Sequence, residues 1–125
     1  MTQDEVSYKI RGAIFAVYNK TGPGLLESAY EAALIYELTK AGLKVEAQVP
    51  LPMTYETIRL GIGFRIDLLV EGEVIIEIKS VEELNPVHHK TLLTYLVLSN
   101  KRLGILVNFN TAEIDKSIIR ILNGY

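Results

Sequence analysis

One stretch restricts the fold more than any other. Residues 103–109, with the sequence LGILVNF, form a nearly continuous apolar run of the length of a strand. Such a run is typical of a strand that is buried on both faces, often a parallel one in a helix-covered sheet. A helical segment at residues 85–101, with Pro86 near its first turn, precedes this run, and an apolar strand at residues 74–80 precedes that helix. Strand, helix and strand in this order predict a crossover within a mixed sheet.

Two helices are expected before the sheet. Thr2 can cap the first, and apolar residues then recur at helical spacing, namely Val6, Ile10, Ala13, Ile14 and Val17. The second is expected over residues 25–41, with a buried stripe of Leu26, Ala29, Ala33 and Leu38. Residues 44–56 are extended, and their two prolines suit an edge strand or a bulge. A short strand and a hairpin follow, and a last helix is expected over residues 112–122.

The order helix, helix, three strands, helix, strand, helix predicts an α/β (α+β) fold with a mixed central sheet flanked by helices. The 125 residues suffice for a single domain, residues 1–125, with a substantial core. No apolar run approaches the roughly 20 residues that span a bilayer, and we expect no signal peptide in the acidic, polar start. The absence of cysteine excludes thiolate metal sites and fits a cytoplasmic protein.

The predicted hairpin carries charges at alternate positions. Its arms are FRIDLLV (residues 64–70) and VIIEIKS (residues 74–80), joined around Gly72. Alternation places the charged residues of each arm on one side, and the apolar residues of the first arm on the other, namely Phe64, Ile66, Leu68 and Val70. With a three-residue loop and a left-handed Gly72, the side chains of Asp67, Glu77 and Lys79 would form one cluster.

Two interpretations of this cluster stay open. Two carboxylates at cross-strand separation can hold a hard divalent cation, which could polarise a phosphate, while a lysine offsets developing negative charge. The alternative is a solvated sheet face, because polar residues at every second position are common in sheets. Glu27, an acid close to the apolar stripe of the second helix, is either a helix N-terminal charge or a third acid over the same site.

These residues resemble a known superfamily. Asp67 and, about ten residues later, Glu77-Ile78-Lys79 are similar to the D…(D/E)xK signature of the PD-(D/E)xK nucleases. The restriction-endonuclease-like core of those proteins has the order helix, three strands, helix, strand. The segment GLLESAY, from Gly24 to Tyr30, resembles the GxxExxY motif of a family of small bacterial and archaeal proteins placed in that superfamily. Residues 63–84, 86–96 and 103–109 follow in that family's order, so the resemblance covers nearly the whole chain.

The resemblance implies a metal-dependent nuclease that acts on nucleic acid. It implies Asp67, Glu77 and the carbonyl of Ile78 as ligands of Mg²⁺ or Mn²⁺. It implies Lys79 as the residue that positions water or stabilises the transition state, and Glu27 as an acid that completes the site. Many nucleases of this superfamily form homodimers, although nothing in this sequence demands one.

Two departures from the superfamily pattern leave a second function open. Thr91 stands where related nucleases often carry a glutamine four residues before a tyrosine, and Ile66 stands where a proline often precedes the aspartate. The first departure, together with a net charge of −2, favours a catalytically inactive module that binds nucleic acid or a protein partner.

Four further side chains are candidates for accessory roles. His88 could face the cluster or cap the third helix, and the adjacent His89 would point about 100° away from it. Tyr30 and Tyr95 could hydrogen-bond to the site or lie at the core edge with satisfied hydroxyls. Arg65 could contact phosphate or form a simple ion pair with Asp67.

Overall fold

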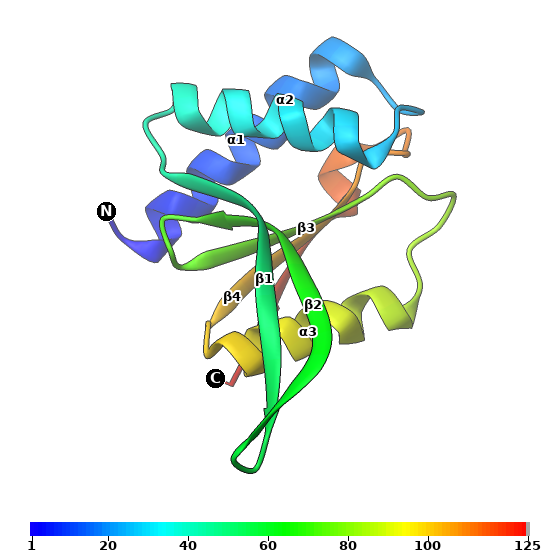
Figure 1. The fold of residues 1–125 in the computed structure, drawn as a ribbon. Helices are drawn as coiled ribbons and strands as arrows, with labels where there is room; N and C mark the ends of the chain where they lie inside the picture. The colour runs from blue at the N-terminus through cyan, green and yellow to red at the C-terminus, as the bar shows by residue number, and fades with distance from the viewer. Residues whose placement is uncertain (125) are drawn as a thin grey trace.

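The computed structural model describes residues 1–124, apart from the side chain of Ile62, as a five-stranded mixed sheet with helices packed on it (Figure 1). The elements along the chain are α1 (Gln3–Thr21), α2 (Glu27–Lys40), β1 (Val45–Tyr55), β2 (Ile58–Val70), β3 (Val74–Lys79), α3 (Pro86–Ser99), β4 (Leu103–Asn108), the 3₁₀ turn η1 (Ile114–Ser117) and β5 (Ile118–Leu122). Strands β3 and β4 are parallel, and the other neighbouring pairs are antiparallel. The predicted mixed sheet with a crossover is therefore confirmed.

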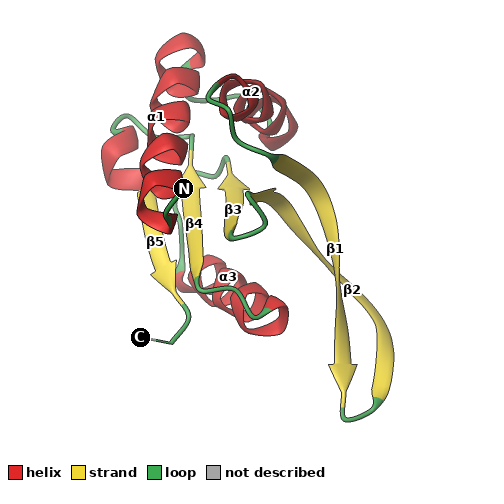
Figure 2. Ribbon diagram, turned by 90° about the vertical axis from the view of Figure 1, so that its left-hand side faces the viewer, coloured by secondary structure: helices red, strands yellow, loops and turns green. Residues whose placement is uncertain are grey.

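Helices cover both faces of the sheet. Helices α1 and α2 lie on one side and α3 on the other (Figure 2), so the buried side chains form two clusters. The cluster under α1 and α2 takes alternate residues of the central strands, for example Leu68, Ile76 and Ile105. The cluster under α3 takes the intervening ones, for example Leu69, Ile75 and Leu106. Strand β4 is buried along its whole length, as the apolar run predicted.

Several features of the helices and strands agree with those predicted from the sequence. Thr2 caps α1 by accepting a hydrogen bond from the amide of Glu5, and the five apolar residues predicted for that helix are buried. The proline-containing segment forms β1, which lies at the edge of the sheet and has a register shift after Pro52. None of the described helices is both long and apolar enough to cross a membrane.

The hairpin between β2 and β3 has the predicted geometry. Val70 pairs with Val74, so the loop has three residues, and Gly72 has a positive φ of 65° that a glycine accepts without strain. Because Leu68 lies opposite Ile76, the same register brings Asp67 opposite Glu77. The short strand expected before the hairpin is continuous with its first arm, and together they form β2.

One part of the predicted alternation is wrong. Phe64 and Ile66 pack in the cluster under α3, whereas Leu68 and Val70 lie in the cluster under α1 and α2. The side changes at Asp67. Next to it on β1, Gln48 has a φ of 53°, an unusual conformation for a residue other than glycine. Strand β2 therefore has an inner half between β1 and β3, and an outer half paired with β1 alone.

Two helix predictions are also wrong. The segment of residues 112–122 contains η1 and β5 instead of a helix. The β-branched residues Ile118, Ile119 and Ile121 lie in β5, which pairs antiparallel with β4. Helix α2 begins at Glu27, so Leu26 precedes it and is 78% exposed. The buried stripe of α2 is Tyr30, Leu34 and Leu38, of which only Leu38 belongs to the predicted set.

Candidate active site

Two acids from different elements hold the end of β3. Asp67, in the middle of β2, accepts a hydrogen bond through Oδ2 from the amide of Ile78 at 2.8 Å. Glu27, in the first turn of α2, accepts one through Oε1 from the amide of Ser80 at 3.3 Å. The two contacts flank Lys79 along the backbone. The structure therefore brings Glu27, Asp67 and the Glu77-Ile78-Lys79 segment together, as the hypothesis of a third acid required.

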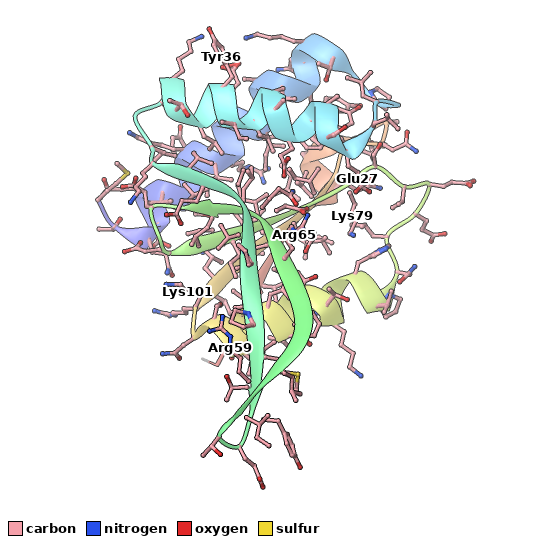
Figure 3. The ribbon with its side chains drawn as sticks, viewed as in Figure 1. Glu27, Tyr36, Arg59, Arg65, Lys79 and Lys101 are labelled. Atoms are coloured by element: carbon pink, nitrogen blue, oxygen red, sulfur yellow. The ribbon has the colours of Figure 1, made fainter. Side chains whose placement is uncertain are left out.

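A hollow of about 190 Å³ lies between α2 and the sheet at this point. Its lining residues are Glu27, Ser28, Glu31, Gln48, Asp67 and Ile78. Figure 3 shows Glu27 and Lys79 close together below α2, with Arg65 on the neighbouring strand. The hollow is mainly acidic, which suits a cation more than a free anion.

Glu77 is the least favourably placed charge of the site. Its side chain is 5% exposed, and its Oε2 atom has no hydrogen-bond partner within residues 1–124. Burial raises the pKa of Glu77 to about 9, with further increases from a hydrogen bond with Asp67 and from the charges of Asp67 and Glu27, while Lys79 opposes the shift. A buried carboxylate is costly unless a proton or a cation neutralises it.

The donor set fits a hard divalent cation. Asp67, Glu77 and the main-chain carbonyl of Ile78 would offer oxygen ligands, and the free Oε2 atom of Glu77 is a donor with no competing partner in the described chain. No three histidine, aspartate or glutamate side chains of the described residues already form a ligand group. The protein would therefore supply two carboxylates and a carbonyl, and Glu27 or water would complete the ligand set.

Lys79 and Tyr95 lie in the electrostatic field of the acid pair. Lys79 is half-buried, and its charge lowers the pKa of Glu77. Burial raises the pKa of the Tyr95 hydroxyl, and the charges of Glu77 and Asp67 raise it further. The ring of Tyr95 packs from α3 against Phe64, with their centroids 5.8 Å apart. The ring of Tyr95 therefore packs at the core edge, one of the two positions that the sequence left open, and the charges of Glu77 and Asp67 act on its hydroxyl.

The turn before α2 fixes the position of Glu27. Gly24 has a φ of 100°, which a side chain would disfavour. Tyr30 is fully buried and stacks on Phe109 at 4.2 Å. Its hydroxyl donates to the carbonyl of Gly22 at 2.6 Å and accepts from the amide of Leu25 at 3.1 Å. The hydroxyl is therefore satisfied by the turn, and Tyr30 acts on the site only by holding the segment that carries Glu27.

His88 and Arg65 do not contact the acid cluster. His88 caps α3, since its Nδ1 atom accepts a hydrogen bond from the amide of Asn85 at 3.2 Å. Arg65 is exposed and donates to Oε1 of Gln48 at 3.4 Å. The predicted ion pair between Arg65 and Asp67 is absent among the described residues. The change of side at Asp67 explains this difference, because the two side chains no longer share one regular strand face.

Three site residues were not predicted. Glu31 lies one helical turn after Glu27 and accepts a hydrogen bond from the amide group of Gln48; its i, i+4 spacing could have indicated it. Ser80 joins β3 to the turn before α2 by donating from Oγ to the carbonyl of Leu25 at 2.6 Å. Nothing in the local sequence pattern distinguishes Gln48 or Ser80.

The order of the elements and the β3–α3–β4 crossover define the class of the protein, an α+β protein with a restriction-endonuclease-like core. The chain belongs to the PD-(D/E)XK nuclease superfamily, because the model of that family matches residues 4–121. No curated protein and no solved structure gives a significant match. The superfamily predicted from Asp67, Glu77 and Lys79 is thus confirmed.

Proposed function

We propose that the protein is a Mg²⁺-dependent nuclease that hydrolyses phosphodiester bonds in nucleic acid. The observation that carries the proposal is the buried carboxyl of Glu77, which lies beside Asp67 and has an oxygen without a partner in the described chain. Such a group opposes folding, so its presence favours a role in binding a cation. Membership in a nuclease superfamily supports the same conclusion.

The residues of the site would divide the work as follows. Asp67, Glu77 and the carbonyl of Ile78 would hold Mg²⁺ or Mn²⁺. The bound ion supplies Lewis acidity toward a phosphate oxygen and lowers the pKa of a neighbouring water. Lys79 would orient the attacking water or stabilise the negative charge that develops on the phosphate. Glu27 would support the site from α2, as a further ligand or through water.

We also assign the chain to the GxxExxY family within the superfamily. This assignment is supported by the way Gly24, Glu27 and Tyr30 act as one unit, with the glycine and the tyrosine shaping the turn that carries the acid. A cytoplasmic location is part of the proposal and rests on the cysteine-free composition. Nucleic acid is the proposed partner, and a homodimer stays an expectation from the superfamily.

A catalytically inactive module with the same fold is the second candidate. Thr91 favours it, because related nucleases often carry a glutamine at this position of the helix after ExK. Such a module would bind nucleic acid or a protein without cleaving it, and Asp67→Ala would leave that binding intact. Titration with Mn²⁺ distinguishes the two functions. The nuclease should bind the ion at Asp67 and Glu77, whereas the inactive module needs no cation there.

Cleavage assays test the proposed function. We expect the purified protein to cut at least one of single- or double-stranded DNA or RNA in the presence of Mg²⁺ or Mn²⁺. Lys79→Ala should lower the rate by at least about 10²-fold, as expected for the loss of a group that stabilises the transition state. Lys116→Ala, at an exposed lysine of η1, is the matched control and should retain full activity. Absence of cleavage with either metal would contradict the proposal.

A further inference from the structure

We propose that one face of the β1–β2 ribbon binds the phosphate backbone of the nucleic-acid substrate and guides it to the candidate active site. The inference rests on the proposed function. Outside the region paired with β3, β1 and β2 continue as a twisted two-stranded ribbon that extends from the body (Figure 1). An isolated two-stranded ribbon adds little stability by itself, so its length calls for another explanation.

Residues that are paired across two strands share one face of the ribbon. The two faces of this ribbon differ in chemistry. The first face is apolar and consists of the pairs Val49–Ile66, Leu51–Phe64, Met53–Leu60 and Tyr55–Ile58. Near the body, this face packs against α3 through Leu92, Leu96 and Tyr95. The base of the ribbon is thereby fixed relative to the site.

The second face, here called the basic face, is exposed at every pair. It consists of Pro50–Arg65, Pro52–Gly63 and Thr54–Arg59. The two arginines are its charged residues, and the other side chains are small or lack charge. Apart from its two chain neighbours, no described residue comes within 4 Å of the position that a Cβ atom would occupy at Gly63. A polymer backbone could approach this face closely.

The arginines of the basic face are available for phosphate. In the part of the chain that the structure describes, neither Arg59 nor Arg65 forms an ion pair with a carboxylate. A guanidinium group matches the geometry of a phosphate. At about 3.3 Å per residue, the two positions are at most about 20 Å apart along the strand, which corresponds to about six base-pair steps of duplex DNA.

Pairing with another protein strand is a less suitable use of this ribbon. Pro50 and Pro52 remove backbone donors from β1, the edge strand, and prolines at such positions oppose the addition of a further strand. The basic face also lacks the large apolar side chains that anchor most protein interfaces. Its chemistry therefore favours a phosphate backbone.

The basic face leads directly into the acidic hollow. Arg65 donates to Gln48, Gln48 donates to Glu31, and the last two residues line the hollow together with Asp67. Figure 3 shows Arg65 beside the region of Glu27 and Lys79, and Arg59 further along the ribbon. The acids of the hollow repel phosphate, so cations on the approach would raise the local concentration of substrate.

Direct binding measurements test the inference without dependence on catalysis. We would measure fluorescence anisotropy with labelled 20-mers of single- and double-stranded DNA and RNA, in buffer with EDTA and at several salt concentrations. For the form that wild type prefers, the double variant Arg59→Ala/Arg65→Ala should bind at least about tenfold more weakly. The slope of log K against log salt should fall by about one for each arginine. Lys116→Ala should match wild type.

The outcomes separate this inference from the proposed function. Lys116→Ala should hydrolyse the small diester bis(p-nitrophenyl) phosphate at the wild-type rate, whereas Lys79→Ala should not. Wild-type protein that binds a 20-mer but hydrolyses no diester would contradict the nuclease function and leave the ribbon inference standing. Equal binding by wild type and the double variant would overturn the inference, as would wild type that binds none of the 20-mers. Weaker binding accompanied by a changed oligomeric state would also overturn it, in favour of a protein interface.

Discussion

Two glutamates of this molecule have opposite surroundings. Glu37 of α2 pairs with Lys20 of α1 at 2.9 Å, and the hydrogen bond to Lys20 lowers the pKa of Glu37. Glu77 lies buried beside another acid, and burial raises its pKa to about 9. The first arrangement favours the folded chain, whereas the second opposes it. A charge that the fold does not compensate indicates where the chain is organised for chemistry.

The largest expected effect comes from Glu77→Gln. We expect cleavage to fall by at least about 10²-fold, because the site loses a ligand and a negative charge. The free energy of unfolding at pH 8 should stay equal or rise, because the amide needs no neutralisation in the interior. Parallel cleavage assays and urea titrations measure both quantities. The contrast between Glu77 and Glu37 would be removed if Glu77→Gln kept its cleavage activity. It would also be removed if the unfolding free energy fell as much as in an ordinary core mutation.

The pH dependence of stability sharpens the same contrast. In the unfolded chain Glu77 loses its proton near 4.5, whereas in the folded protein it keeps it up to about 9. The folded state therefore binds more protons than the unfolded chain in this window. The contribution of Glu77 to the unfolding free energy is fully present below pH 4.5 and is lost as the pH rises through 9. The contribution falls by about 1.4 kcal/mol per pH unit.

Urea unfolding of wild type and Glu77→Gln at pH 5 to 9, without divalent cations, isolates this contribution. The difference between the two stability curves should increase in favour of the variant as the pH rises, because all other titrating groups are shared. Two parallel curves would show that Glu77 does not hold a raised pKa.

Tyr30→Phe should have an intermediate effect. It leaves the carbonyl of Gly22 and the amide of Leu25 without their hydroxyl partner, which should cost about 1–3 kcal/mol of unfolding free energy. Cleavage should fall by less than in Glu77→Gln, because Glu27 is held more loosely. Tyr36→Phe, at a residue that is 65% exposed, is the matched control and should change neither quantity. Equal behaviour of the two variants would contradict the role assigned to the turn.

The smallest effect is expected for Lys20→Ala. The lysine is exposed, so the loss of its pair with Glu37 should lower the unfolding free energy only slightly, and less so at high salt. Cleavage should be unchanged, because this pair lies between α1 and α2, away from the acids of the site. A substantial loss of cleavage would show that the two glutamates are not functionally separate.

The sequence predicted those features of the fold that depend on strong local patterns. The apolar run of β4, the three-residue loop around Gly72 and the cap at Thr2 each depend on nearby residues, and each is observed. The approach of Asp67 to Glu77 followed from the same hairpin register. Since the fold carries Glu27 to the end of β3, the sequence could state that contact only as a hypothesis, and the hydrogen bond to Ser80 now supports it.

The wrong predictions arise where tertiary contacts override local pattern. The last segment, expected to be a helix, contains isoleucines that complete the sheet beside β4. The stripe of α2 is rotated because the ring of Tyr30 stacks on Phe109, about eighty positions away in the chain. The change of side at Asp67 coincides with the unusual conformation of Gln48 in the neighbouring strand, and Arg65 contacts Gln48 where simple alternation predicted Asp67.

A crystal structure with Mn²⁺ tests the central claim most directly, because anomalous scattering locates the ion without reference to activity. We predict one strong peak between the carboxylates of Asp67 and Glu77, within ligand distance of the carbonyl of Ile78, and no such peak in Glu77→Gln. A peak elsewhere, or no peak in wild type at saturating Mn²⁺, would contradict the assignment of this acid pair as the metal centre of a nuclease.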